Sequence, residues 1–120
     1  MKRQLLFVQG GGKSVHDDWD SKLVESLRQE LGEDYDILYP RMPGEEEPHY
    51  AAWKATLEGL FRTLPAGAIV VGHSIGAAIL IKVLAEQSSA RKFGAIFLIG
   101  PFRRPASIGF RAATISSAMT

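Results

Sequence analysis

The stretch Ala68-Ile69-Val70-Val71-Gly72-His73-Ser74-Ile75-Gly76 decides the fold of this 120-residue chain. It begins as an apolar, β-branched run, which is typical of a strand buried on both faces of a sheet. It then breaks at two glycines that flank a serine, and a helix-forming stretch over 75–87 follows. This order predicts a strand that reverses sharply into a helix, because glycine tolerates a tight turn with other backbone pressed close.

The turn fits the pattern G-x-S-x-G, in which a strand-to-helix reversal lifts a serine hydroxyl above the edge of a sheet. Gly72 and Gly76 supply the two glycines, and Ser74 is the candidate nucleophile. The backbone N–H of Ile75, at the start of the helix, points to where an oxyanion would form. The simpler interpretation is a serine in an ordinary turn, but the flanking strand and helix favour the catalytic interpretation.

Alternating strands and helices surround this turn. Strands are predicted at 5–8, 35–39, 69–71 and 95–99, and helices at 19–31, 49–64 and 75–87. The alternation predicts an α/β fold of three layers, with a parallel sheet, right-handed crossovers and helices on both faces. Ligands of such sheets bind at the carboxyl ends of the strands. The glycines after the first strand, the loop 41–48 and the turn at Ser74 all lie at that edge.

The predicted helices differ in their apolar faces. The first has Asp17 or Asp18 as its N-cap, Gly32 as its end and a four-residue stripe of Trp19, Leu23, Leu27 and Leu31. The second is expected to bury Trp53, Leu57, Leu60, Phe61 and Leu64. The third is apolar nearly all round, which is typical of a core helix. The loop 41–48 holds two prolines, a glycine and three glutamates, and is predicted to be irregular.

The composition excludes several classes of protein. The formal net charge of +1 gives no overall field that would attract nucleic acid. The chain has no cysteine, which excludes disulfides and thiolate metal sites and fits a reducing compartment. The apolar run after Met1 ends at Gly10, too short for a membrane span, and lacks a signal-peptide cleavage site. We therefore expect one cytoplasmic domain without nucleic-acid or membrane partners.

These segments together resemble the α/β-hydrolase superfamily, and more closely the small, nearly lidless serine hydrolases typified by retinoblastoma-binding protein nine. The resemblance covers about residues 4–102. It is carried by the turn at Ser74, the glycine-rich loop at Gly10, Tyr39-Pro40-Arg41-Met42-Pro43 followed by Trp53, and the strand 95–99 ending in Gly100-Pro101-Phe102. It implies a partial α/β-hydrolase fold with strand order 2-1-3-4 and neither cofactor nor metal.

By that resemblance Ser74 is the nucleophile that forms an acyl-enzyme, with a small-molecule ester or amide as substrate. The backbone N–H groups of Ile75 and Gly11 are then the two oxyanion donors, and Gly10 and Gly12 shape the loop. Glycine suits this role, because it lets a backbone N–H approach the substrate without a side chain in the way. The alternative for the three glycines is a flexible exit from the strand.

The same loop also has features of nucleotide-binding loops. Gly12-Lys13-Ser14 follows a strand, as the end of a phosphate-binding P-loop does. That motif requires a glycine where Phe7 stands, and the carboxylates of Asp17 and Asp18 would repel phosphate. The dinucleotide fingerprint requires a third glycine where Val15 stands. Both nucleotide-binding interpretations are therefore disfavoured.

The catalytic triad is incomplete in this sequence. In the α/β-hydrolase order an acid and then a histidine follow the serine, but no histidine follows Ser74 and the single later acid is Glu86. His73 is expected to pack within the turn, whereas His16 and His49 belong to loops near the predicted site and are more simply solvated. Loss of the base typically costs about a million-fold in rate. We therefore expect very low activity from the isolated chain.

Residues 103–120 form a basic tail without a strand-length apolar run and without resemblance to the family. We interpret 1–102 as the front part of a hydrolase domain, and the tail as the result of truncation or a shifted reading frame, or as a genuine short variant. The strand 95–99 then has an uncovered edge, which predicts self-association. Two functions stay open, a serine hydrolase and a non-catalytic hydrolase remnant that binds a protein partner through this edge or the loop 41–48.

Overall fold

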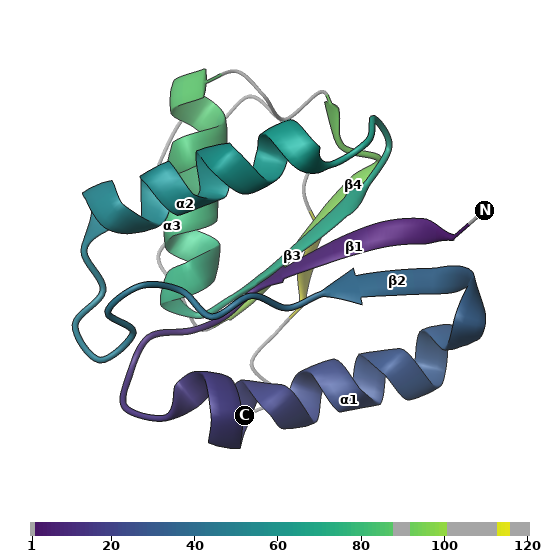
Figure 1. The fold of residues 1–120 in the computed structure, drawn as a ribbon, viewed down its shortest axis with the longest axis horizontal. Coiled ribbons are helices and arrows are strands. Elements are labelled where there is room, and N and C mark those ends of the chain that lie inside the picture. Colours follow the sequence, from purple (N-terminus) through teal and green to yellow (C-terminus); the bar gives the residue numbers. More distant parts are fainter. Residues whose placement is uncertain (1, 88–91, 101–112, 116–120) are drawn as a thin grey trace.

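The computed structural model describes residues 2–87, 92–100 and 113–115, the last three as backbone alone. Its central feature is a parallel five-stranded sheet in the order β2-β1-β3-β4-β5 (Figure 1). The strands are β1 (Arg3–Val8), β2 (Tyr35–Leu38), β3 (Ile69–His73), β4 (Ala95–Ile99) and β5 (Ala113–Ile115). The α/β fold class and the order 2-1-3-4 of the first four strands are confirmed.

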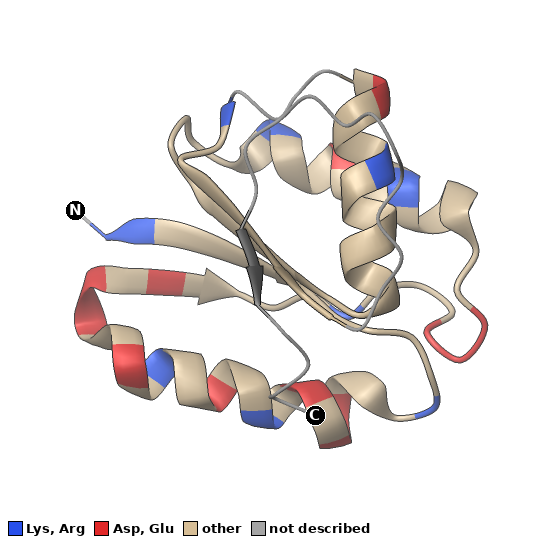
Figure 2. Ribbon diagram, turned by 180° about the vertical axis from the view of Figure 1, so that it is seen from behind, with Lys and Arg blue, Asp and Glu red and all other residues tan. Residues whose placement is uncertain are grey.

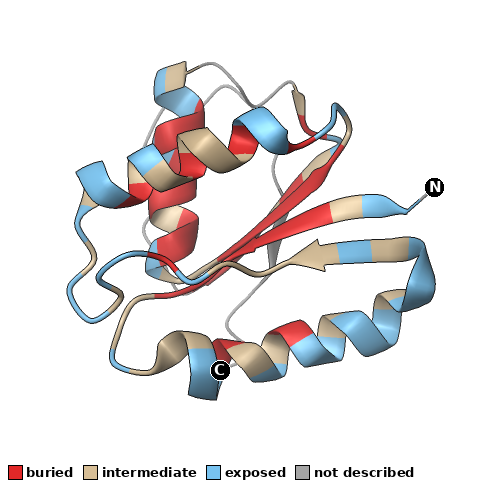
Figure 3. Cartoon of the chain, viewed as in Figure 1, coloured by how far each residue is buried: buried red, intermediate tan, exposed pale blue. Residues whose placement is uncertain are grey.

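Helices cover both faces of this sheet (Figure 1). They are α1 (Asp20–Leu31), α2 (Tyr50–Thr63) and α3 (Ile75–Gln87). Successive strand residues point to opposite faces, so Leu6 and Val8 pack with the side chains of α2 and α3, whereas Leu5 and Phe7 pack with those of α1. Figure 3 shows that the buried residues concentrate in β1, β3 and α3. The three predicted layers are therefore present.

The strand register brings the carboxyl ends of three strands to one edge. Val8 at the end of β1 pairs with Gly72 in β3, and Gly72 in turn pairs with Leu98 in β4. The loop that follows β1, the turn that follows β3 and Gly100 after β4 consequently meet at the same edge of the sheet. This is the edge at which parallel α/β sheets bind ligands.

The start of α1 differs from the prediction. A π-helical turn, Val15–Trp19, precedes the helix, and Trp19 occupies the cap position without a side-chain cap hydrogen bond. The prediction of Asp17 or Asp18 as N-cap is wrong, because the wider turn moves the helix start to Asp20. The prediction that Trp19 belongs to the apolar stripe of this helix is also wrong, because Trp19 is 68% exposed. Val24 is the buried apolar residue of α1. The predicted terminator, Gly32, does end the helix with φ 70°.

The other two helices agree with the prediction. The helix α3 has the predicted bounds, and α2 begins after His49 and ends just before Leu64. Trp53, Leu57, Phe61 and Leu64 are buried and Leu60 is partly buried against the same core. The loop 41–48 forms turns, as its prolines and glycine predict.

The structure also corrects the prediction that β4 has an uncovered edge. The backbone of β5 pairs in parallel with β4, with Phe97 opposite Ala113 and Ile99 opposite Ile115. The expectation of an uncovered strand 95–99 is therefore wrong for residues 97–99. A three-residue strand is too short to give an apolar pattern, so the sequence did not reveal it. The predicted basic tail thus contributes to the sheet, while the rest of 103–120 lies outside the described residues.

Charged residues lie mainly on the outside of the layers. Figure 2 shows Asp and Glu along α1 and at the turn between α1 and β2. In the part of the chain that the structure describes, no helix combines the length and the apolar character needed to span a bilayer.

Candidate active site

The turn between β3 and α3 holds Ser74 in the left-handed region, with φ 57°. Residues other than glycine rarely adopt this backbone conformation, and they keep it where the surrounding structure enforces it. The N–H of Ser74 donates to the carbonyl of Ile99 at 2.9 Å, which ties the turn to the end of β4. The carbonyl of Ser74 accepts from Ala77 and Ala78 at 3.0 and 3.2 Å, which closes the first turn of α3. The serine backbone is therefore fixed from both sides.

Both glycines of the motif are required by close backbone contacts. A Cβ on Gly76 would lie 2.0 Å from the carbonyl oxygen of Gln9. A Cβ on Gly72 would lie 2.8 Å from the Cα of Ala77. Neither contact involves the flexible end of a side chain, so no larger residue fits either position without moving the backbone. Because Gly76 has no side chain, the start of α3 can lie directly against the backbone at the end of β1.

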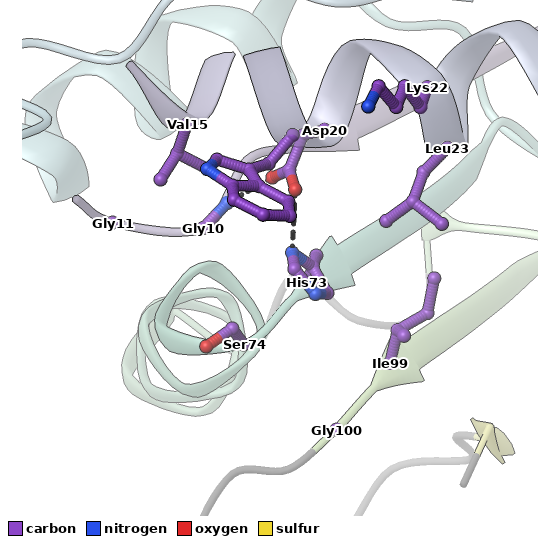
Figure 4. A pocket seen from close by; sticks show the side chains of 11 residues that line it. Gly10, Gly11, Val15, Asp20, Lys22, Leu23, His73, Ser74, Ile99 and Gly100 are labelled. Atoms are coloured by element: carbon purple, nitrogen blue, oxygen red, sulfur yellow. Dashed lines mark hydrogen bonds and ion pairs between the residues drawn. The ribbon is translucent and has the colours of Figure 1, made fainter. Parts of the chain in front are cut away.

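The glycine loop after β1 lies directly beside this turn. A Cβ on Gly10 would lie 3.5 Å from the Cβ of Ser74, and a Cβ on Gly11 would lie 2.9 Å from a methyl group of Ile75. A cavity of about 460 Å³ opens here (Figure 4). The cavity is lined by the glycine loop, the π-helical turn, the start of α1, the turn at Ser74 and the end of β4. The lining residues are Gly10, Gly11, Val15, Trp19, Asp20, Lys22, Leu23, His73, Ser74, Ile99 and Gly100. The structure thus brings Ser74, Ile75 and Gly11 together at one edge.

The loop 41–48 is fastened to the glycine loop by the buried amide of Gln9. The side-chain Oε1 of Gln9 accepts from the backbone N–H of Met42 at 2.7 Å, and its Nε2 donates to Glu45 Oε1 at 3.0 Å. Met42 is buried in the core, and the indole N–H of Trp53 donates to the carbonyl of Pro43 at 2.7 Å. These contacts give the Met-Pro segment and Trp53 of the sequence a structural role.

Glu45, unlike its exposed neighbours Glu46 and Glu47, is half-buried and forms several hydrogen bonds. Its Oε1 also accepts from the backbone N–H of His16 at 3.0 Å, and its Oε2 pairs with Arg41 at 2.7 Å. Its backbone carbonyl accepts from Gly12 at 2.7 Å. The His16 N–H, the Gln9 amide and the Arg41 guanidinium stabilise the carboxylate and lower the pKa of Glu45 below 4.5.

The remaining contacts of this region surround His16. Its ring stacks on Tyr39 with centroids 4.0 Å apart, and its Nδ1 lies 3.0 Å from Asp17 Oδ1. Both carboxylate oxygens of Asp17 also accept from Arg41, at 2.7 and 2.8 Å, and these contacts with Arg41 and His16 lower the pKa of Asp17. Despite these acids, the described ranges contain no group of three or more His, Asp or Glu side chains placed to hold a metal ion.

Asp20 is a buried acid at the site. It is fully buried at the start of α1, and its Oδ2 accepts from the backbone N–H of Gly10 at 2.6 Å. Its Oδ1 lies 2.9 Å from His73 Nδ1 (Figure 4). This second contact is an ion-pair distance without the alignment of a regular hydrogen bond, and neither atom has another partner among the described residues. The carboxylate therefore joins α1 to the glycine loop and to the end of β3.

In the described part of the chain, no hydrogen bond or ion pair joins the side chain of any of the three histidines to Ser74. His73 follows the strand alternation, and Figure 4 shows its ring and the Ser74 hydroxyl pointing in different directions. His16 faces Tyr39 and Asp17, and His49 is an exposed residue before α2. The later acid, Glu86, contacts Tyr50 and Lys54 on the outer surface of α2 and α3.

The family model described as "Serine hydrolase" matches residues 5–118. The chain belongs to the serine hydrolase family. The match runs past residue 102, where the resemblance read from the sequence ended. The search of curated proteins found no match to this chain.

Two solved structures share the α/β fold of this chain. The ydeN gene product from B. subtilis has a TM-score of 0.59 and 24% identity, over 82% of this chain and 51% of that one. A PytH variant has a TM-score of 0.54 and 15% identity, over 82% of this chain and 40% of that one. The chain thus spans about half the length of these proteins. At these identities the similarity shows the fold alone.

Two residues of the candidate site were missed in the sequence. Asp20 lies four residues before the buried Val24, so both residues are on the side of α1 that faces the sheet. An acid on a buried helix face is unusual, and this position could have indicated a specific role for Asp20. Gln9 is a single polar residue between a buried apolar strand and three glycines. Both are fully buried, and their roles depend on partners far away in the sequence.

Proposed function

We propose that this chain carries the nucleophile of a serine hydrolase that cleaves small acyl esters or amides. The observation that supports this most directly is Ser74, held at φ 57° in a glycine-flanked turn on the wall of a cavity. A nucleophile elbow requires this combination of strained backbone and exposed hydroxyl. We infer the elbow from it, with Gly72 and Gly76 as its glycines.

The proposed reaction proceeds in two steps. The Oγ of Ser74 bonds to the acyl carbon of the substrate, and the alcohol or amine leaves with a proton. Water then attacks the acyl-enzyme and releases the acid, which frees the serine. The N–H groups of Gly11 and Ile75 are the proposed donors to the negatively charged oxygen that forms in each step. Their residues lie beside each other, with the Gly11 Cβ position 2.9 Å from the Ile75 side chain.

The missing base limits this activity. We propose that the hydroxyl proton of Ser74 passes to solvent, since no histidine side chain is hydrogen-bonded to Ser74 among the described residues. The oxyanion donors and substrate binding alone typically leave about 10³ to 10⁴ over the reaction in water. We therefore propose a slow reaction of Ser74 in this chain. A cytoplasmic location, suggested by the absence of cysteine, stays a prediction.

A fluorophosphonate probe tests this proposal, because its phosphorus bonds to the Oγ of a nucleophilic serine as fluoride leaves, and a serine without a base should react slowly. We expect one phosphonate per chain after prolonged incubation, located at Ser74 by peptide mass spectrometry. Ser74→Ala should abolish the label, whereas Ser26→Ala, at an exposed serine of α1, should leave it unchanged. Absence of label at Ser74 in the folded wild-type chain would contradict the proposal.

The absence of a placed base also favours a second candidate, a non-catalytic remnant that binds a protein partner. That candidate predicts no phosphonate label and a defined complex that survives Ser74→Ala. Its proposed surface is the loop 41–48, since β5 covers residues 97–99 of the other edge. The labelling experiment therefore separates the two candidates.

A further inference from the structure

We propose that Asp20, together with Gln9, is a positioning residue that fixes the N–H of Gly11 relative to Ser74. The inference rests on the proposed function, because Gly11 is one of the proposed oxyanion donors. Asp20 and Gln9 both act through the peptide groups on either side of Gly10.

The two side chains hold Gly10 from both ends. The N–H of Gly10 donates to Asp20 Oδ2 at 2.6 Å, and the carbonyl of Gly10 accepts from Gln9 Nε2 at 3.0 Å. That carbonyl belongs to the same planar peptide group as the N–H of Gly11. In a trans peptide the C=O and N–H point in opposite directions. The Gln9 amide therefore fixes the direction in which the Gly11 N–H points, and Asp20 fixes the peptide group before it.

Asp20 also connects this loop to the turn of the nucleophile. Its other oxygen lies 2.9 Å from His73 Nδ1, and His73 directly precedes Ser74. Both atoms are buried and, within the described part of the chain, have no other partner. A buried carboxylate and imidazole left without each other would each lose solvation without compensation. One side chain from α1 thus holds the loop after β1 and the end of β3 at a set separation.

Small displacements of the glycine loop relative to Ser74 should change the reactivity of the serine. A Cβ on Gly10 would lie 3.1 Å from His73 Nδ1, and a Cβ on Gly11 would lie 2.9 Å from Ile75, so the loop and the turn are already in close contact. Oxyanion donors act at about 2.7–3.1 Å from the charged oxygen. A misplacement of about 1 Å can cost about 100-fold in rate. A clamp on Gly10 therefore bears directly on the reactivity of Ser74.

The decisive comparison uses Asp20→Ala against Asp18→Ala, which removes an exposed carboxylate two residues earlier. We expect Asp20→Ala to slow the fluorophosphonate reaction of Ser74 about 10- to 100-fold. Asp18→Ala should stay within about twofold of the wild type. Asp20→Asn keeps an oxygen for the Gly10 N–H and should recover part of the loss.

Two spectroscopic readouts separate positioning from general stability. The amide resonances of Gly10 and Gly11 should move in Asp20→Ala and stay in place in Asp18→Ala. The ¹⁵N shifts of His73 should report a proton on Nδ1 in the wild type, because the carboxylate lies beside that nitrogen, and this bias should be lost in Asp20→Ala. A merely structural role of Asp20 would move neither the Gly11 amide nor the His73 tautomer in a folded variant.

The outcomes are distinct. A folded Asp20→Ala variant that reacts at the wild-type rate, or that leaves the Gly11 amide unmoved, would overturn the inference. If the wild-type chain takes no label, the proposed function fails, and the Gly11 and His73 resonances alone decide the clamp. If Asp20→Ala does not fold, Gln9→Glu decides it, since it keeps the size of the side chain and removes the donor to Gly10. A wild-type reaction rate in folded Gln9→Glu would then overturn the inference.

Discussion

At the residue scale, the site depends on backbone conformations that few residues adopt. Ser74 stands at φ 57°, and the glycines on either side of it leave no room for a side chain. The pattern G-x-S-x-G made this turn predictable, because each glycine has a geometric reason. The pattern did not reveal Asp20, since a carboxylate acquires its role only when a distant backbone N–H and an imidazole come to lie beside it.

The close contact at Gly76 leads to a stability prediction. Gly76→Ala would place a methyl group 2.0 Å from the Gln9 carbonyl oxygen, so α3 has to move away from β1. We expect the free energy of unfolding to fall by about 3 kcal/mol or more, the upper range for overpacked sites. Urea unfolding followed by circular dichroism measures this change.

Gly59→Ala is the matched control for Gly76→Ala. Gly59 lies within α2, and a Cβ there would meet nothing nearer than the Arg62 guanidinium at 3.9 Å. Alanine is the better helix former, so this substitution should raise the free energy of unfolding by about 0.5–1 kcal/mol. Equal effects of the two substitutions would show that the contact at Gly76 is not restrictive.

At the scale of elements, the predictable parts are those whose signals are local. The strand 95–99 and the helix 75–87 have the predicted bounds, because apolar runs bounded by glycine or by the turn define them. The start of α1 was not predictable to the residue. The π-helical turn before it depends on the bond from the His16 N–H to Glu45, which lies in a loop far along the chain.

The link between Glu45 and the glycine loop predicts a dependence of stability on pH. The pKa of Glu45 is lowered in the folded chain, chiefly by the His16 N–H. Its contribution is therefore present above pH 4.5 and is lost as the pH falls through the folded-state pKa. At pH 7 we expect Glu45→Gln to lower the free energy of unfolding by about 1 kcal/mol, less than the roughly 1.5–3 kcal/mol of a hydrogen bond to a charged group, because glutamine keeps one acceptor oxygen.

Urea unfolding of both proteins between pH 7 and pH 3 measures this effect. The difference between wild type and Glu45→Gln should shrink below pH 4.5. Glu46→Gln removes the charge of the exposed neighbouring glutamate and should leave the stability of the chain close to that of the wild type. A difference for Glu45→Gln that stays constant over the whole range would contradict the assignment.

At the scale of the whole molecule, the sheet order and the family were predictable, whereas the edge of the sheet was not. Alternation of strands and helices defines the layers, and the turn at Ser74 indicates the family. Pairing of β5 with β4 depends on three residues and has no pattern of its own in the sequence. The predicted self-association through the strand 95–99 has to be reconsidered, because that strand is partly covered.

This pairing makes a prediction about association. Thr114→Pro removes the central N–H of β5 and fixes its φ, which should disrupt the pairing with β4 and uncover its edge. We expect larger species at micromolar to millimolar concentrations, the range in which exposed strand edges associate. Size-exclusion chromatography with light scattering detects them.

Thr114→Val serves as the control, because valine keeps the backbone N–H and the branched side chain. It should elute as the wild type does. Elution of Thr114→Pro at the wild-type position at every concentration would show that β5 does not protect the edge.

The two tryptophans provide the chain with separate optical reporters. Trp19 is 68% exposed on the wall of the cavity, whereas Trp53, a residue of α2, is fully buried in the core. Iodide should quench the red-shifted emission of the first and leave the blue-shifted emission of the second. A small molecule that enters the cavity should alter the first signal alone, while loss of the core alters both. The chain therefore distinguishes occupancy from unfolding in a single spectrum without an added dye.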